Sequence, residues 1–283
     1  MEGTALPPED CSLRTLYSYD EFEQVAALQM EALGLRQTDV FPPKLMKVAV
    51  DNGGAVVGAF DAAGKLVAFV FNFPGQRYGR PIEWSYLIAV APCQRGRGLE
   101  RRLKLVQRRA VLERGFSTVC WAFDPLDAGA ARRNLHELGA LSDEYVLEFP
   151  DPMSGPVYNC FTSDRLIAFW NLDDPRVATR LASTPQETEV PEEVCLIEPG
   201  ELEAGRGPPG APEVGWDDNV LAFPIPVDYA GLRRGNKDAA RSWRLLTRAT
   251  LNRCFSRGFV TSDFVYRQPE RPDWGWYVLQ RNS

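Results

Sequence analysis

The sequence predicts a mixed α/β protein built in two parts, and three patterns lead to this fold class. Up to residue 172, runs rich in β-branched and aromatic residues alternate with stretches of helical periodicity. Residues 173–218 interrupt the alternation with a segment rich in Pro, Gly and Glu. Strand and helix patterns then return in the tail. We therefore expect a first domain at residues 1–172 and a smaller C-terminal α+β lobe at residues 173–283.

The elements of the first domain follow one another with clear boundaries. A helix is expected from Asp20, a candidate N-cap, to Gly34, and a shorter helix follows at 42–54. Two β-rich runs around a Gly-containing turn, at 55–61 and 66–75, predict a hairpin. The same signals place the later elements in order: strand 82–92, helix 98–113, strand 117–125, helix 127–139, strand 142–149 and strand 165–172.

The C-terminal lobe is expected to contain fewer elements. Residues 173–218 are interpreted mostly as connecting structure around a short strand at 194–197. The tail then predicts a strand at 220–226, a long helix at 236–258 and two closing strands at 259–267 and 275–281.

Composition excludes several classes of function. The chain has 283 residues and a net charge of −6, so no general positive field attracts nucleic acid or an anionic membrane. It has no apolar run of about 18 residues and no signal-like start, so we expect a cytoplasmic protein without a membrane segment. Six cysteines lie far apart without a C-x-x-C pair, and the chain has a single histidine, His136. We therefore expect no metal site, and we interpret His136 as a surface or boundary residue.

Residues 91–105, APCQRGRGLERRLKL, combine a strand end, a Gly-containing turn and a basic helix start. Such a turn presents unpaired backbone N–H groups at one point, and glycines allow an anion to approach the main chain. Leu99, Leu103, Val106 and Ala110 are spaced as the apolar face of the helix. The stretch therefore predicts a phosphate-binding turn, and the alternative is an ordinary turn before a helix with a solvated basic face.

The stretch LIAVAPCQRGRGLERRLK resembles the acyl-CoA binding motif of the GNAT superfamily of N-acyltransferases. In that motif a strand ending in hydrophobic-x-V-x-P precedes R/Q-x-x-G-x-G/A at a helix start. The order of elements over roughly residues 12–172 is also similar. Three further segments resemble a subgroup of large GNAT proteins with a C-terminal extension: WAFDPLDAGAARRNLHELGA, TSDRLIAFWNL and AARSWRLLTRATLNRCFSRGFVTSDFVY.

The resemblance implies a GNAT fold, with a mixed, splayed central sheet, helices on both faces and a smaller C-terminal lobe. It also implies acetyl-CoA or another acyl-CoA as co-substrate and no metal. The residues that fall on the cofactor-binding positions are Ile88, Ala89, Val90, Arg95, Gly96, Arg97, Gly98, Leu99, Glu100 and Asn134.

Three positions depart from the family pattern. Glu100 stands where the family has Gly or Ala, Ala130 where relatives often have Asn, and Leu135 where many carry a tyrosine general acid. A carboxylate at Glu100 would repel a bound pyrophosphate if it pointed inward, and the alternative is that it points outward and pairs with Arg101, Lys104 or another neighbour. These departures favour a second hypothesis, a non-catalytic GNAT-fold binding or scaffold protein with an impaired CoA site.

The reaction implied by the resemblance is direct attack of an amine on the acyl-CoA thioester, which gives an amide and free CoA. Glu83 is our candidate base, and Ser85, two residues on, shares its strand face and would position a water. Tyr145 is a candidate proton donor to the leaving thiolate. The structural alternatives are an exposed strand carboxylate for Glu83 and a packing role for Tyr145.

The acceptor is expected to be a small amine such as an amino acid, and the acyl group either acetyl or succinyl. Trp84 and Tyr86 lie on a strand that would flank the acceptor, and Arg165 is a candidate for binding a substrate carboxylate, with a structural salt bridge as the alternative. We expect the C-terminal lobe to pack against the first domain and either to cover the acceptor entrance or to form a homodimer surface.

Overall fold

The computed structural model describes residues 11–149, 163–182, 190–191, 194–198, 201–210, 218–266 and 273–281. The chain divides into two compact units: the first holds the residues up to Trp121, and the second holds the described residues from Ala122 on. This division falls earlier in the chain than the boundary at residue 172, which was expected from composition and stays a prediction.

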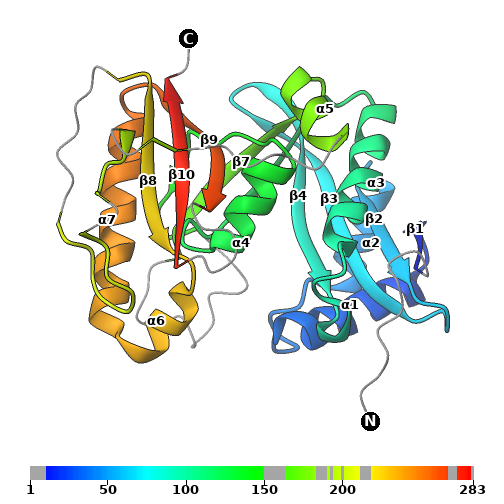
Figure 1. The fold of residues 1–283 in the computed structure, drawn as a ribbon. Helices are drawn as coiled ribbons and strands as arrows, with labels where there is room; N and C mark the ends of the chain where they lie inside the picture. The colour runs from blue at the N-terminus through cyan, green and yellow to red at the C-terminus, as the bar shows by residue number, and fades with distance from the viewer. Residues whose placement is uncertain are drawn as a thin grey trace. The chain divides into compact units, whose positions relative to one another are not determined.

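The first unit is organised around a mixed sheet (Figure 1). Its strands are β1 (Ser12–Leu16), β2 (Ala55–Phe60), β3 (Leu66–Arg77), β4 (Arg80–Val90) and β5 (Thr118–Phe123), and they are neighbours in that order. The pairs from β1 to β4 are antiparallel, whereas β5 runs parallel to β4. The mixed α/β class is therefore confirmed.

Three helices accompany this sheet: α1 (Tyr19–Leu33), α2 (Pro43–Asp51) and α3 (Leu99–Glu113). The start of α1 differs from the prediction, because Ser18 rather than Asp20 is the N-cap and forms a capping box with Glu21. Its end at Gly34 is confirmed, with a φ of 67°.

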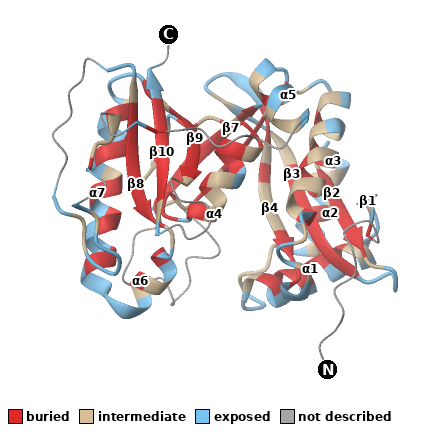
Figure 2. Cartoon of the chain, viewed as in Figure 1, coloured by how far each residue is buried: buried red, intermediate tan, exposed pale blue. Residues whose placement is uncertain are grey.

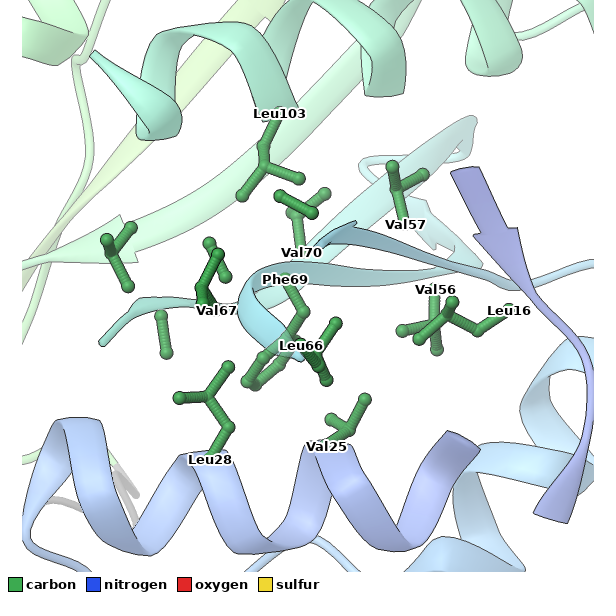
Figure 3. Close-up of a cluster of buried hydrophobic side chains, with 14 of the residues drawn as sticks. Leu16, Val25, Leu28, Val56, Val57, Leu66, Val67, Phe69, Val70 and Leu103 are labelled. Carbon is green, nitrogen blue, oxygen red and sulfur yellow. The ribbon is translucent and has the colours of Figure 1, made fainter. Parts of the chain in front are cut away.

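The core of the first unit lies on both faces of β2 and β3. Figure 3 shows Val25 and Leu28 reaching the sheet from α1 and Leu103 reaching it from α3 on the opposite side. Every residue of β2 is buried, as the colouring of Figure 2 shows. A strand covered on both faces reads as a continuous apolar run, which is why the hairpin was visible in the sequence.

The second unit contains two short groups of strands and most of the C-terminal helices (Figure 1). Its elements are α4 (Ala128–Ala131), a π-helical turn (Arg132–Glu137), β6 (Tyr145–Val146), β7 (Arg165–Asn171), α5 (Pro175–Ala182), β8 (Val220–Pro226), α6 (Tyr229–Gly235), α7 (Lys237–Phe255), β9 (Phe259–Tyr266) and β10 (Trp274–Arg281). Strands β6 and β7 pair antiparallel, and β8, β10 and β9 form an antiparallel sheet in that order. The expected smaller C-terminal sheet is confirmed.

Several local predictions in this unit were wrong. The strand expected at 142–149 is reduced to β6, because Leu141 and Ser142 before it form isolated bridges to two different strands. Helix α5 lies in the segment interpreted as connecting structure, and α6 was not predicted. The strand expected at 194–197 is one bridge, from Cys195 to Ala222. None of the described helices combines the length and hydrophobicity that crossing a bilayer requires.

Candidate functional site

The turn between β4 and α3 has the backbone geometry that the glycine pair predicted. After β4, a single turn of 3-10 helix at Pro92–Gln94 leads into Gly96 and Gly98, which both have a φ of +73°. No atom lies within 4 Å of a Cβ built at either glycine, so the requirement for glycine is conformational rather than a matter of crowding. Gly98 is the N-cap of α3 and supplies no side-chain cap, so the first-turn N–H groups of α3 remain available as donors.

The arginine side chains of this turn stabilise the turn itself. Arg95 donates to the carbonyl of Ala32 in the last turn of α1, and Arg97 donates to Oε1 of Gln94 at 2.6 Å. Arg95 is exposed and Arg97 is half-buried. The Arg95 side chain therefore anchors the turn to α1, and the part of the turn that would bind an anion is the main chain of Gly96 and Gly98.

Strands β4 and β5 diverge over the second half of β4, which leads to this turn. Their parallel register covers the pairs Glu83–Val119 and Trp84–Cys120, whereas β4 continues to Val90. Tyr86 is an extra residue in β4, because the register with β3 shifts between the pairs made by Ser85 and Leu87. The splayed sheet expected from the resemblance is therefore present, with a bulge at the point of divergence.

A buried lysine occupies the vertex of this divergence. Nζ of Lys104, on α3, donates to Oγ of Ser85 at 2.9 Å and lies 3.8 Å from the ring centroid of Trp121. Ser85 and Trp121 are the residues directly after the last paired positions of β4 and β5. Lys104 is 5% exposed, so α3 places a cation inside the unit where the strands separate.

Glu100 and Lys104 act on one another across one turn of α3. Burial lowers the pKa of the Lys104 ammonium to about 7, against the opposing effect of the Glu100 carboxylate, which raises it. Glu100 is half-buried, and a carboxylate four residues before a lysine is the favourable helical arrangement. The structure therefore shows an electrostatic interaction of Glu100 with Lys104, which is one of the alternatives open for this carboxylate.

Glu83 belongs to a buried polar network beneath α3. Its Oε2 accepts from Nδ2 of Asn72 at 2.5 Å, and its Oε1 lies 2.9 Å from a guanidinium nitrogen of Arg114. Gln107 connects this group to the vertex, since it donates to Asn72 at 3.2 Å and to Ser85 at 3.1 Å. The Glu83 side chain has no exposed surface, so the structural alternative of an exposed strand carboxylate was wrong.

The pKa of Glu83 is raised by burial, although Asn72 and Arg114 act against the increase. A carboxylate held in this way is enclosed by protein groups on each oxygen. Glu83 is therefore held by Asn72 and Arg114 and has no exposed surface, and its role as a base stays a prediction.

The opposite side of the β3–β4 hairpin carries aromatic residues. Phe41, Phe71, Phe73 and Tyr86 form a cluster with ring centroids 5.0–6.0 Å apart. Tyr86 and Trp84 are half-buried, and Arg77 lies 5.8 Å from the Trp84 ring centroid. The two aromatic residues expected near the acceptor thus lie on β4 at or beside the bulge, with Tyr86 inside an aromatic cluster.

Three of the predicted site residues belong to the second unit. The hydroxyl of Tyr145 donates to Asp164 at 3.0 Å, and burial together with that carboxylate raises the Tyr145 pKa well above its usual value. Arg165 is buried and donates to the Asp164 carbonyl at 2.9 Å, and Asn134 lies in the π-helical turn. Tyr145 and Arg165 are therefore part of a buried polar cluster that Arg248 completes by a bidentate pair with Asp164.

His136 is buried in the interior of the second unit, so the expectation of a surface or boundary histidine was wrong. It is 1% exposed, and its Nδ1 lies 2.8 Å from Asp263, which also accepts from Arg180 at 2.6 Å. Burial alone would raise the pKa of Asp263, but His136 and Arg180 bring it down to about 2. The sequence carried no signal for this, because Asp263 lies 127 residues further along the chain.

In the part of the chain that the structure describes, no group of three or more His, Cys, Asp or Glu side chains is arranged to hold a metal ion. The chemistry of the candidate site is that of N–H donors, a hydroxyl and an ammonium.

Comparison with known proteins gave matches among solved structures. No protein-family model matches the chain, and no curated protein does. The chain is similar to an aminoglycoside acetyltransferase from an uncultured soil metagenomic sample, solved with trehalose, at 18% identity over 43% of this chain and 83% of that one, with a TM-score of 0.38. It is also similar to the ribosomal-protein-S18-alanine N-acetyltransferase of Escherichia coli, at 15% identity over 58% and 95% of the two chains, with a TM-score of 0.47.

A third similar structure is the GNAT family N-acetyltransferase YhbS of Escherichia coli in complex with CoA. It is 22% identical over 41% of this chain and 64% of that chain, with a TM-score of 0.35. Each of the three likenesses covers only part of this chain.

Proposed function

We propose that this chain is an acyl-CoA dependent N-acyltransferase of the GNAT type that transfers an acetyl or succinyl group to a small amine such as an amino acid. The observation that carries the proposal is the left-handed turn at Gly96 and Gly98, placed between a diverging strand pair and the start of α3. First-turn N–H groups and the helix dipole favour a phosphate at that point.

The chemistry joins the amine nitrogen to the thioester carbonyl carbon, after which the carbon–sulfur bond breaks and CoA leaves as a thiolate. One edge of β4 pairs with β3, and the other edge pairs with β5 only as far as Trp84. Strand N–H groups alternate sides, so those near Leu87, Ile88 and Ala89 that point to this edge would donate to the developing oxyanion. A thiol has a reference pKa of about 8.5, so departure of the thiolate needs little assistance.

Among the expected catalytic residues, Ser85 has the placement that supports a direct role. Its hydroxyl lies at the vertex and accepts from Lys104 and Gln107, so its own hydrogen is left to donate elsewhere. Glu83 would act through the network as a positioning residue. For Tyr145 and Arg165, the buried contacts with Asp164 favour the structural alternatives.

The second candidate function is a GNAT-fold binding protein without turnover, and Glu100 in the first turn of α3 is the observation that favours it. The interaction of Glu100 with Lys104 weakens this alternative, because a carboxylate compensated by an ammonium repels an incoming pyrophosphate less.

Calorimetric titration with CoA, acetyl-CoA and succinyl-CoA tests the proposal, with Gly98→Ala as the site variant. Gly64→Ala is the matched control, because Gly64 also has a positive φ, 77°, and open space around its Cβ but lies in the β2–β3 turn. Both variants carry a similar conformational cost, about 1 kcal/mol or more. The proposal expects micromolar binding by the parent, a loss of about tenfold or more in Gly98→Ala and little change in Gly64→Ala. An absence of binding by the parent would contradict it.

A further inference from the structure

The groups that contact Nζ of Lys104 are a hydroxyl, a side-chain amide and an aromatic ring, and none of them is a carboxylate. Nζ donates to Oγ of Ser85 at 2.9 Å and to Oε1 of Gln107 at 3.1 Å, and it faces the ring of Trp121. Hydroxyl, amide and ring each stabilise an ammonium less than a hydrogen-bonded carboxylate does. At 5% exposure the ammonium also lacks hydration, so these contacts stabilise its charged form only in part.

The place of this ammonium along the chain relates it to the proposed donor site. Lys104 lies at the vertex where β4 and β5 part, about one and a half helical turns after the glycine turn. A donor anchored by its pyrophosphate at Gly98 and extended along the diverging edge of β4 would bring its acyl end toward Ser85 and Lys104. These two side chains would then be the polar groups that the acyl end meets.

We propose that Lys104 is a specificity-determining residue that selects an acyl-CoA whose acyl group ends in a carboxylate, of the succinyl class, over an uncharged acyl group. This inference rests on the proposed function, because it requires the donor to lie between the diverging strands. The carboxylate would accept a hydrogen bond from Nζ of Lys104 and another from the hydroxyl of Ser85. The Ser85 oxygen already accepts from Lys104 and Gln107, so its own hydrogen is available for donation.

The same contact predicts a coupling between donor binding and protonation. Burial lowers the pKa of Lys104 to about 7, so part of the free protein lacks the ammonium proton near neutral pH. A carboxylate beside Nζ favours the charged form, so binding of a carboxylate-ended donor would be accompanied by proton uptake. An uncharged acyl group of equal length would take up less.

The test compares succinyl-CoA with butyryl-CoA, which has the same four-carbon acyl length without the carboxylate, by calorimetry at pH 7. The parent is expected to bind succinyl-CoA about tenfold or more tightly than butyryl-CoA, and Lys104→Met is expected to reduce that ratio to about one. Arg109→Met is the matched control, because it removes a cation of α3 whose side chain is 76% exposed, and it is expected to keep the ratio.

Equal affinity of the parent for the two donors, or an unchanged ratio in Lys104→Met, would overturn the inference while leaving the proposed function in place. If CoA itself does not bind, the proposed function falls and this inference falls with it. Should Lys104→Met fail to fold, the parent still decides the matter: titrations in buffers of different ionisation enthalpy must show greater proton uptake with succinyl-CoA than with butyryl-CoA, and equal uptake would overturn the inference.

Discussion

The ion pair between Arg114 and Glu83 gives the sharpest prediction of the network beneath the candidate site. Replacing Arg114 by Met removes the cation 2.9 Å from a carboxylate that has no exposed surface. It also removes a hydrogen bond from Arg114 to the carbonyl of Gly53. The substitution keeps most of the apolar stem, so the main change is a buried charge without its partner.

The expected cost follows from the burial of the two groups. Removing one partner of a fully buried pair costs about 3–5 kcal/mol. The Arg114 side chain is 27% exposed and the hydrogen bond from Asn72 to Glu83 remains, so we expect a loss of about 2–3 kcal/mol in the free energy of unfolding of the first unit. Burial already raises the pKa of Glu83, and the variant would raise it further. At low pH Glu83 is protonated and the variant loses less free energy of unfolding. The loss grows as pH rises through the raised pKa of Glu83.

Native-state hydrogen exchange of the β3 and β4 amides measures this free energy within the first unit. A double-mutant cycle of Glu83→Gln, Arg114→Met and the double variant separates the ion pair from the contacts of Arg114 with Gly53 and Ala110, and we expect a coupling energy of about 1–2 kcal/mol between the two positions. A cost below about 0.5 kcal/mol at pH 8, or no coupling, would refute the reasoning, because it would mean that water reaches Glu83.

Three further predictions concern other buried polar groups. The free energy of unfolding of the parent, measured in urea relative to that of Lys104→Met, should increase between about pH 7 and 10. In that range the lysine of the unfolded chain keeps a proton that the folded one, with a pKa of about 7, has lost. A difference that does not change with pH would contradict this. In His136→Asn, the pKa of Asp263 should rise from about 2, as read from its carboxyl carbon shift by NMR, and a value that stays would show that Arg180 alone sets it. Tyr145→Phe should cost about 1 kcal/mol in urea unfolding through the lost hydrogen bond, and no cost would place the hydroxyl in water.

The sequence predicted the parts of the site that depend on local backbone geometry. Gly96 and Gly98 adopt a positive φ that few other residues tolerate, so their presence before a helical pattern indicated the turn directly. The helix end at Gly34 was visible for the same reason. The hairpin strands were visible because the first unit buries both of their faces.

The side-chain environment of the site could not be predicted with equal success, because it depends on distant residues. Glu83 is buried by partners at positions 72 and 114, and no local pattern distinguishes such a carboxylate from an exposed one. The apolar face assigned to α3 was confirmed in part. Leu99 and Leu103 are buried and Val106 packs against the core, but the polar side chains of Lys104 and Gln107 are buried as well. The spacing of four residues from Glu100 to Lys104 was the one available signal for the lysine.

The central claim is that an acyl-CoA binds at the glycine turn before α3. Selective ¹⁵N-glycine labelling followed by amide NMR tests it directly, because it observes the amides of Gly96 and Gly98 themselves. The other glycines among the 23 of the chain serve as internal controls. On addition of CoA, the account predicts chemical-shift changes at Gly96 and Gly98 and none at Gly64. Saturating CoA that leaves the amides of Gly96 and Gly98 unchanged would contradict the account.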